Sequence, residues 1–398
     1  MSLETTFIDF FVERGHSPIM GSTLIPRPGD PVLFTTSGMH ALTPYLEGEP
    51  HPLGHRLVGV QRCLRTTDLD EVGDPNHLTV FEMLGSWSLG DYDAEQSLQW
   101  GYELLRDTLG IDPGRLHVTV FGGDQQVEPD EASLRTWRAL GVPVELTTDD
   151  NWWPNRTGTG LCGPDSEIFL WTGDGPPEGT PTTDDRWVEV WNHVMMRFRR
   201  HEDGSLEPLE QRNIDTGLGL ERLSMLLEGK SSVYETELFE PWMRLLPELW
   251  KLDEESERIV IDHLRSSIVI IGDGVRPSNT GRGYVLRRLI RRVLTLLWQV
   301  DRSRTLVDLP LEVVEHTLRR FHQEEDVTPV QQVLVDEEVR FTDLLERGRR
   351  ILGSDRFRKP LDRGDFEYLH QTHGLPPDLV RSLIAQRGGG SSAPLPRT

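Results

Sequence analysis

The run RCLRTTDLDEVGDPNHLTVFEMLGSWSLGDY, residues 62–92, decides the fold of this chain. It holds the end of one apolar segment, LVGVQRCLR (57–65), and the whole of a second, HLTVFEMLGSWSL (77–89). Segments of this length and composition are typical of strands, and the Gly, Pro, Asp and Asn of the intervening TTDLDEVGDPN (66–76) are typical of a loop. We therefore predict two strands of a sheet joined by a polar loop.

The pattern on either side of this pair extends the sheet. Alternating segments predict strands at 116–121 and 187–198, and apolar residues at helical spacing predict helices at 3–14 and 93–108. Turn-forming residues bracket positions 32–34, where we expect one more short strand. Short strands with few helices indicate an α+β fold on an antiparallel sheet.

The pattern becomes helical in the second half of the chain. We predict an α+β domain over residues 1–230 and an all-α domain over 231–385. The glycine, serine and proline content of the end, GGGSSAPLPRT, predicts a flexible tail over 386–398.

Composition excludes several classes of protein. The net charge of −23, from 65 acidic against 42 basic residues, argues against a general nucleic-acid binder, and we expect no DNA partner. Two cysteines are too few for a disulfide framework or a four-cysteine zinc site. No run of 18 apolar residues occurs, and the start MSLETTFIDFF is not basic, so we expect a cytoplasmic protein without a membrane partner.

Residues suited to ATP are spread along the first half of the chain. Neither GxxxxGK[ST] nor a GxGxxG after a strand occurs, so the common nucleotide folds are not indicated. Arg65, Phe81 and Arg222 are each weak signals, but in this order they suggest an ATP site built on a sheet. Gly217 and Gly219, in a predicted turn before a helix, would let the backbone approach a ligand closely.

Six segments together resemble the alanyl-tRNA synthetase branch of the class II aminoacyl-tRNA synthetases. GSTLIPRPGDPVLFTTSGM, the run 62–92 and NIDTGLGLERL (213–223) are similar to the three class II motifs. CGPDSEIF (162–169), EVWNHVMMRF (189–198) and the run 262–292 are similar to further segments of that branch. The resemblance implies a class II antiparallel sheet flanked by helices, then a helical domain. We expect a truncated, free-standing relative without the editing domain.

The resemblance also implies an ATP site. In the family, residues at the positions of Arg65, His77, Phe81, Met83 and Arg222 bind ATP. Arg65 and Arg222 would be catalytic, because guanidinium groups pair with phosphate and stack on rings. Magnesium is the ion expected with ATP, although the sequence does not name its carboxylate ligands. Without the motif, Phe81 and Met83 would be read as core residues.

An alanine pocket is implied by the same resemblance. Asp215 matches the aspartate that binds the substrate ammonium, while Trp153, Asn192 and Val194 match the pocket around it. Gly217 would let the substrate come close. The alternative for Asp215 is a helix cap, since it precedes a glycine turn and a helix.

An arginine-rich stretch marks the candidate acceptor site. Residues 276–304 hold eight arginines and one acid, against the overall charge. The resemblance implies that this region binds tRNA, and we select Arg282, Arg288 and Arg292 as acceptor-binding residues. The alternative is a solvated face paired with acidic neighbours.

Three positions depart from the family pattern. The loop after Arg65 is short and has no lysine. Gly281 stands where the family reads a base pair of the acceptor stem with asparagine, and Asn279 is out of register. Gln371 stands where the partner aspartate is expected. Each base-reading contact is worth roughly 1–3 kcal/mol, so discrimination for that pair should be weak.

These observations predict an ATP-dependent ligase that activates alanine as alanyl-adenylate and transfers it to an acceptor. The altered reading positions favour a small molecule or an unusual carrier over ordinary alanine tRNA. A compact alanine–tRNA ligase is the first alternative. A non-catalytic synthetase paralogue is the second, and the joint presence of Arg65, Asp215 and Arg222 argues against it.

Overall fold

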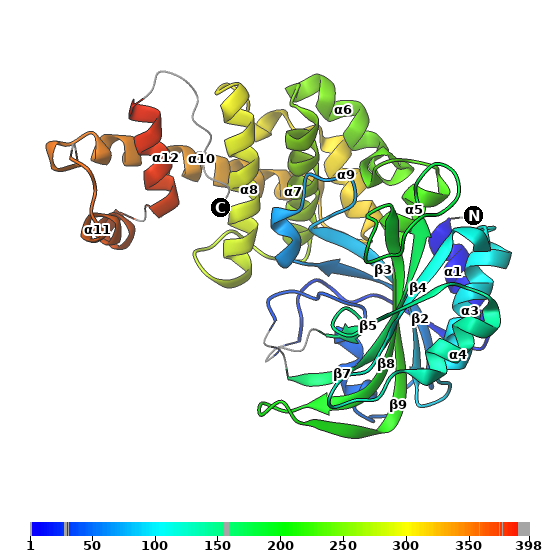
Figure 1. The fold of residues 1–398 in the computed structure, drawn as a ribbon. Helices are drawn as coiled ribbons and strands as arrows, with labels where there is room; N and C mark the ends of the chain where they lie inside the picture. The colour runs from blue at the N-terminus through cyan, green and yellow to red at the C-terminus, as the bar shows by residue number, and fades with distance from the viewer. Residues whose placement is uncertain are drawn as a thin grey trace. The chain divides into compact units, whose positions relative to one another are not determined.

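The computed structural model describes residues 2–27, 30, 32–154, 159–357, 359–373, 375 and 377–388 (Figure 1). The chain divides into two compact units. The first comprises Met1–Thr67 and Val80–Leu238, and the second comprises Asp68–Thr79 and Phe239–Thr398. The loop after Arg65 therefore belongs to the helical unit, although it joins two strands of the first. The expected tail lies outside the described residues from residue 389 onward.

A mixed, mostly antiparallel sheet forms the first unit. Among the residues described, its order is β1-β2-β3-β9-β8-β7-β4-β5, with β6 paired to β7. Only the β1–β2 and β4–β5 pairings of these are parallel. The strands are β1 (Ser17–Ile19), β2 (Arg56–Leu64), β3 (Val80–Leu89), β4 (Leu116–Phe121), β5 (Val144–Thr147), β6 (Trp152–Trp153), β7 (Gly160–Trp171), β8 (Trp187–Arg200) and β9 (Leu206–Gly219).

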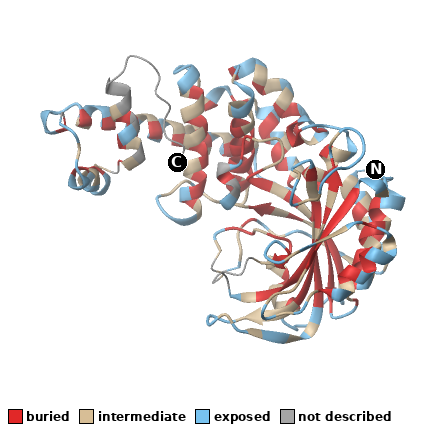
Figure 2. Ribbon diagram, viewed as in Figure 1, coloured by how far each residue is buried: buried red, intermediate tan, exposed pale blue. Residues whose placement is uncertain are grey.

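Helices cover one face of this sheet. They are α1 (Leu3–Val12), α3 (Ala94–Glu103), α4 (Glu131–Leu140) and α5 (Leu220–Leu227). Apolar side chains from these helices and from alternate strand positions, such as Leu84, Trp191 and Ile214, form one buried core. In Figure 2 the strands and the helices beside them carry many buried residues, drawn in red. The remaining strand positions, which alternate with these, carry side chains on the opposite face of the sheet.

The opposite face carries a smaller apolar cluster. Trp87, Val194 and Met196 pack there with Met39 and Leu42, the second of which directly precedes the short helix α2 (Thr43–Leu46). This cluster covers only part of the face, so residues beside it on β3, β8 and β9 stay partly accessible. The predicted α+β class with a mostly antiparallel sheet is confirmed.

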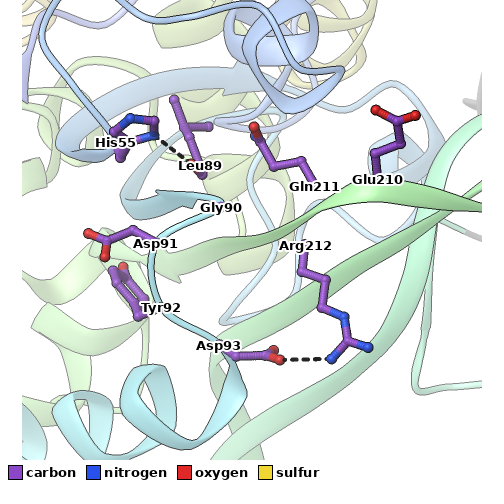
Figure 3. Close-up of a pocket in the computed structure, with 9 residues that line it drawn as sticks. All are labelled: His55, Leu89, Gly90, Asp91, Tyr92, Asp93, Glu210, Gln211 and Arg212. Carbon is purple, nitrogen blue, oxygen red and sulfur yellow. Dashed lines mark hydrogen bonds and ion pairs between the residues drawn. The ribbon is translucent and has the colours of Figure 1, made fainter.

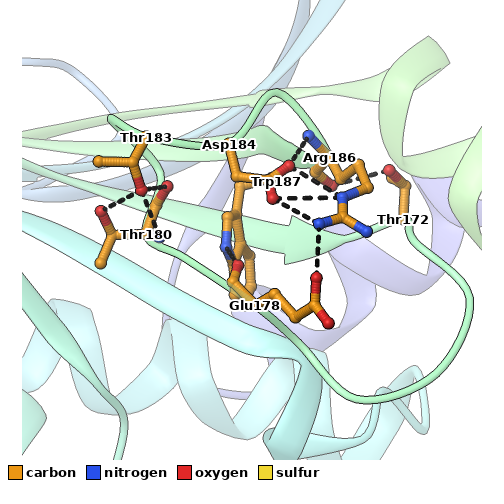
Figure 4. Close-up of polar contacts among 7 residues, drawn as sticks. All are labelled: Thr172, Glu178, Thr180, Thr183, Asp184, Arg186 and Trp187. Atoms are coloured by element: carbon orange, nitrogen blue, oxygen red, sulfur yellow. Dashed lines mark hydrogen bonds and ion pairs between the residues drawn. The ribbon is translucent and has the colours of Figure 1, made fainter.

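The connection between β7 and β8 is stabilised by charged groups (Figure 4). Arg186 pairs with Asp184 at 2.6 Å and with Glu178 at 2.9 Å, and its guanidinium lies 4.3 Å from the centre of the Trp171 ring. Trp187 donates from its indole nitrogen to the Glu178 carbonyl oxygen at 3.0 Å. These contacts join the ends of the two strands that carry much of the candidate site.

Helices form most of the second unit. They are α6 (Glu240–Trp250), α7 (Glu254–Gly272), α8 (Gly281–Val300), α9 (Leu311–Arg320), α10 (Val327–Leu352), α11 (Arg363–His373) and α12 (Pro377–Gly388). None of the helices in the described part of the chain is both long and apolar enough to cross a membrane.

Two local predictions were wrong. Residues 32–34 form bends, and the strand of this region is instead Ser17–Ile19, which pairs with β2. Residues 213–219 belong to strand β9, so the glycines at 217 and 219 lie in a strand and not in a turn. Hydrogen bonding to β8 and β3 holds these glycines extended, which local composition does not reveal.

Candidate active site

The three central strands place the proposed site residues on the face opposite the helices. Strand register aligns Trp87 of β3 with Asp215 of β9, and Asp215 with Val194 of β8. The same register aligns Asn192 with Gly217. Because side chains alternate along a strand, these positions share one face of the sheet.

Asp215 is a buried carboxylate in the middle of this face. Its side chain accepts a hydrogen bond from the Trp87 indole nitrogen at 2.6 Å. Burial raises the pKa of Asp215 to about 7, and the Trp87 hydrogen bond only partly opposes this rise. Asp215 lies within β9, and Gly219 is the residue that precedes helix α5, so the helix-cap alternative is wrong. The carboxylate is therefore suited to binding a cation.

Gly217 and Met83 approach each other closely beside Asp215. A Cβ atom at position 217 would lie 2.7 Å from the Met83 sulfur. A side chain at position 217 would therefore displace Met83, which lies next to the candidate amino-acid site. Both residues are only partly buried, which leaves them accessible to a ligand.

Val194 and Trp153 belong to the apolar wall of the same face. Val194 is buried within the cluster that contains Trp87, and Trp153 packs on this cluster while remaining partly exposed. Trp153 pairs with Gly163 through the short strand β6. Together these side chains offer an apolar surface suited to a small group such as a methyl.

Arg65 and Phe81 lie together at one end of the face. The Arg65 guanidinium carbon is 5.1 Å from the centre of the Phe81 ring, and its Nε donates to the Thr36 carbonyl oxygen at 3.3 Å. Both side chains are partly buried. The cation and the ring predicted for phosphate and adenine are thus neighbours in space.

Arg222 projects from the first turn of α5 and pairs with Glu189. Its Nη1 lies 3.2 Å from the Glu189 carboxylate and 3.3 Å from the Glu189 carbonyl oxygen. This ion pair is about one third exposed. Sequence reasoning did not identify Glu189, although it lies within EVWNHVMMRF, one of the segments quoted above.

Two further carboxylates on β7 were also missed. Asp165 and Glu167 lie on the candidate face, because Asp165 aligns with Val194 and Glu167 with Asn192. Burial raises the pKa of both groups, and the nearby Glu189 raises them further. CGPDSEIF contains both residues, but nothing in its spacing reveals that they are buried.

His77 lies in the segment Asp68–Thr79 of the second unit. Its Nδ1 is 2.5 Å from the Asp74 carboxylate, and its Nε2 is 3.1 Å from the Glu71 carboxylate. The ring is thus held between two acidic side chains from its own loop.

The arginines of α8 divide into two groups. Arg287 and Arg291 pair with the fully buried Glu337 of α10, at 3.1 and 2.7 Å. Arg292 donates to the Leu69 carbonyl oxygen at 2.8 Å. Arg287 and Arg291 therefore pair with an acidic neighbour, as the alternative interpretation of this stretch predicts. Neither of them was selected as an acceptor-binding residue.

Arg282 and Arg288 are partly exposed on the same helix. Gly281 begins the helix with φ of +57°, a left-handed conformation that glycine and asparagine adopt more easily than other residues. Asn279 accepts a hydrogen bond from Arg287, and Gln371 is exposed on α11.

A separate cleft of about 470 Å³ opens in the first unit (Figure 3). Asp93 at its edge pairs with Arg212 at 3.5 Å, and Asp91 pairs with Arg56. None of the residues selected for ATP or alanine lines it. Its lining consists of His55, Leu89, Gly90, Asp91, Tyr92, Asp93, Glu210, Gln211 and Arg212.

Comparison with known proteins decides the family. The model of the "tRNA synthetases class II (A)" family matches residues 2–391. The chain belongs to this family. It is 41% identical to an alanine–tRNA ligase of Treponema pallidum over 97% of the chain and 68% of that protein. It is also 38% identical to the Rubrobacter xylanophilus enzyme over 96% of the chain and 46% of that protein.

This class II chain spans about half to two thirds of the length of the curated relatives. Among solved structures, it is similar to a pyrrolysyl-tRNA synthetase of Desulfitobacterium hafniense, with a TM-score of 0.35 and 16% identity over 59% of this chain and 70% of that one. A histidyl-tRNA synthetase of S. aureus gives a TM-score of 0.35 and 13% identity over 62% and 74%. The family match and the identity to the alanine–tRNA ligases show that the chain contains a class II synthetase catalytic domain of the alanine–tRNA ligase kind.

Proposed function

We propose that this class II domain activates alanine with ATP. The observation that carries the proposal is Asp215, a buried carboxylate that shares one sheet face with Asn192 and Gly217. A buried carboxylate without a salt-bridge partner is costly unless a cation joins it, and the substrate ammonium is such a cation. Val194 and Trp153 would surround the methyl group.

Activation joins the substrate carboxylate to the α-phosphorus of ATP and releases pyrophosphate. Negative charge builds on the phosphate oxygens, and cations fixed beside them lower the barrier. We assign this role to Arg65 and Arg222. Phe81 and Met83 would contact the adenine, and His77 is assigned to ATP binding by the family resemblance alone.

Magnesium would be bound mainly through ATP. Among the described residues there is no group of three or more His, Cys, Asp or Glu side chains that could hold a metal ion. Magnesium commonly takes one or two carboxylates together with substrate phosphates. Glu189, which is partly exposed and pairs with Arg222, is the protein ligand we propose.

The second part of the proposal concerns the acceptor of the alanyl group. The names of the relatives support a tRNA-type acceptor, which is the alternative of a compact alanine–tRNA ligase. Gly281 offers no side chain to a base pair, however, and Gln371 replaces a carboxylate with an amide. We therefore propose an acceptor other than ordinary alanine tRNA, bound through Arg282, Arg288 and Arg292. Residues 1–230 would perform activation, and residues 231–385 would bind the acceptor.

Alanine-dependent exchange of pyrophosphate into ATP tests the activation step. Wild-type protein should exchange, while Arg65→Ala and Asp215→Ala should abolish exchange. Arg106→Ala is the matched control, because Arg106 is an ion-paired surface arginine that follows helix α3, on the helix-covered face of the sheet and away from the candidate site. No exchange by the wild-type protein would contradict the proposal. Charging of alanine tRNA at a rate comparable to exchange would contradict only the acceptor.

A further inference from the structure

Glu221 is a buried carboxylate in the first turn of helix α5, and its side chain bonds to a neighbouring strand. The residue is 2% exposed. The Glu82 backbone N–H, from strand β3, donates to this carboxylate, whose two oxygens lie 3.0 and 3.2 Å from the Glu82 nitrogen. Glu82 is itself 3% exposed, so the bond lies in the interior of the first unit. Hydrogen bonds to a charged acceptor are stronger than those between neutral groups.

This hydrogen bond lies where the pairing of β3 with β9 ends. The last pair is Met83 with Gly219, and α5 begins at the residue after Gly219. Glu82, one position further along β3, has already passed the end of β9. A buried backbone N–H needs an acceptor, and the Glu221 side chain supplies one there. The carboxylate therefore continues the ladder of hydrogen bonds one step beyond the strand.

The two elements that this bond joins both carry groups assigned to ATP. Phe81 and Met83 flank Glu82 on β3, and because side chains alternate along a strand, both point to the candidate face. Arg222 directly follows Glu221 on α5. The bond thus connects the strand segment of the proposed adenine contact with the helical turn of the proposed phosphate contact.

We propose that Glu221 is a positioning residue of the ATP site. Its carboxylate fixes the turn of α5 that carries Arg222 against the segment of β3 that carries Phe81. The proposal rests on the ATP-dependent activation proposed above. Glu221 itself does not touch ATP.

A purely structural role of Glu221 is the alternative. An acidic side chain in the first turn of a helix interacts favourably with the positive end of the helix dipole, and Gly219 before α5 makes no side-chain cap. Loss of this interaction alone would lower the free energy of unfolding and leave the affinity of the folded protein for ATP unchanged. A positioning role predicts a change in the affinity for ATP.

Kinetics of pyrophosphate exchange separate the two roles. Glu221→Ala should raise KM for ATP about tenfold, because a small displacement of Arg222 weakens its contact with phosphate, and should leave KM for alanine within about twofold. Glu221→Gln keeps an acceptor at the same reach and should stay within about threefold of the wild-type KM for ATP. Asp130→Ala is the matched control. It removes another buried carboxylate of the first unit, at the start of helix α4, and should leave both KM values unchanged.

Calorimetric titration with ATP and magnesium decides whether Glu221 acts through Arg222. Glu221→Ala should weaken ATP binding about tenfold in the otherwise wild-type protein, and by less than about twofold when Arg222→Ala is also present. An undiminished effect in the Arg222→Ala background would overturn the proposal. An equal rise in KM for alanine, or a wild-type KM for ATP in Glu221→Ala, would do the same.

Thermal melts identify a variant that does not fold. If Glu221→Ala is unfolded, Glu221→Asp decides, because its shorter side chain holds the carboxylate away from the Glu82 nitrogen. A wild-type KM for ATP in Glu221→Asp would then refute the positioning role. A wild-type protein that neither exchanges pyrophosphate nor binds ATP refutes the proposed function itself, whereas an active protein with unaffected Glu221 variants refutes only the role of Glu221.

Discussion

Replacing Asp215 by asparagine should stabilise this protein at high pH while abolishing its activity. The pKa of Asp215 in the folded state is about 7, against an ordinary value of 3.8 for an aspartate. A folded pKa above the unfolded one means that the folded state binds more protons, so stability falls as pH rises from about 4 to about 7. At 1.36 kcal/mol per pKa unit, the shift corresponds to about 4 kcal/mol. Asparagine can still accept from Trp87 but does not titrate.

Urea unfolding at pH 5 and pH 8 measures this effect. The stability advantage of Asp215→Asn over wild type should grow by about 3 kcal/mol between the two pH values, because most of the titration lies in this window. Asp185→Asn, at an exposed position, makes the same change of charge and should show no such growth. Parallel pH profiles for Asp215→Asn and wild type would refute the reasoning. The same titration predicts that KM for alanine rises as pH falls below about 7, since a neutral Asp215 no longer attracts an ammonium.

Three further substitutions test individual contacts and charged groups. Gly217→Ala places a Cβ atom 2.7 Å from the Met83 sulfur, and the displacement should lower kcat/KM for exchange by about tenfold or more. Glu337→Ala leaves Arg287 and Arg291 without their buried partner and should lower the free energy of unfolding in urea by about 3–5 kcal/mol. Arg288→Ala should leave exchange intact and weaken binding of a polyanionic acceptor in a salt-dependent way, and equal loss in both assays would make Arg288 structural.

Local pattern was sufficient for much of the fold. The strands at 57–65 and 77–89 appear as β2 and β3 within a few residues, because alternation and loop composition are local properties. The local pattern gave the wrong structure for residues 213–219. Their glycines predicted a turn, but these residues pair with β3 and β8 and therefore form a strand. The local pattern also did not predict that Asp68–Thr79 belongs to the second unit, because the loop's own composition does not reveal contacts with helices distant in sequence.

Six segments of sequence and their order along the chain, among them the runs that contain Arg65, Asp215 and Arg222, were enough to place this protein among the class II synthetases. Only the tertiary structure decided what surrounds them. Strand register set Asp215 against Trp87, and burial in a low-dielectric interior raised its pKa. The same packing brought Asn151 against the buried Asp165, to which its side-chain nitrogen donates a hydrogen bond. Desolvation and hydrogen bonding depend on residues that are far apart in the chain, so the local sequence around a residue does not predict them.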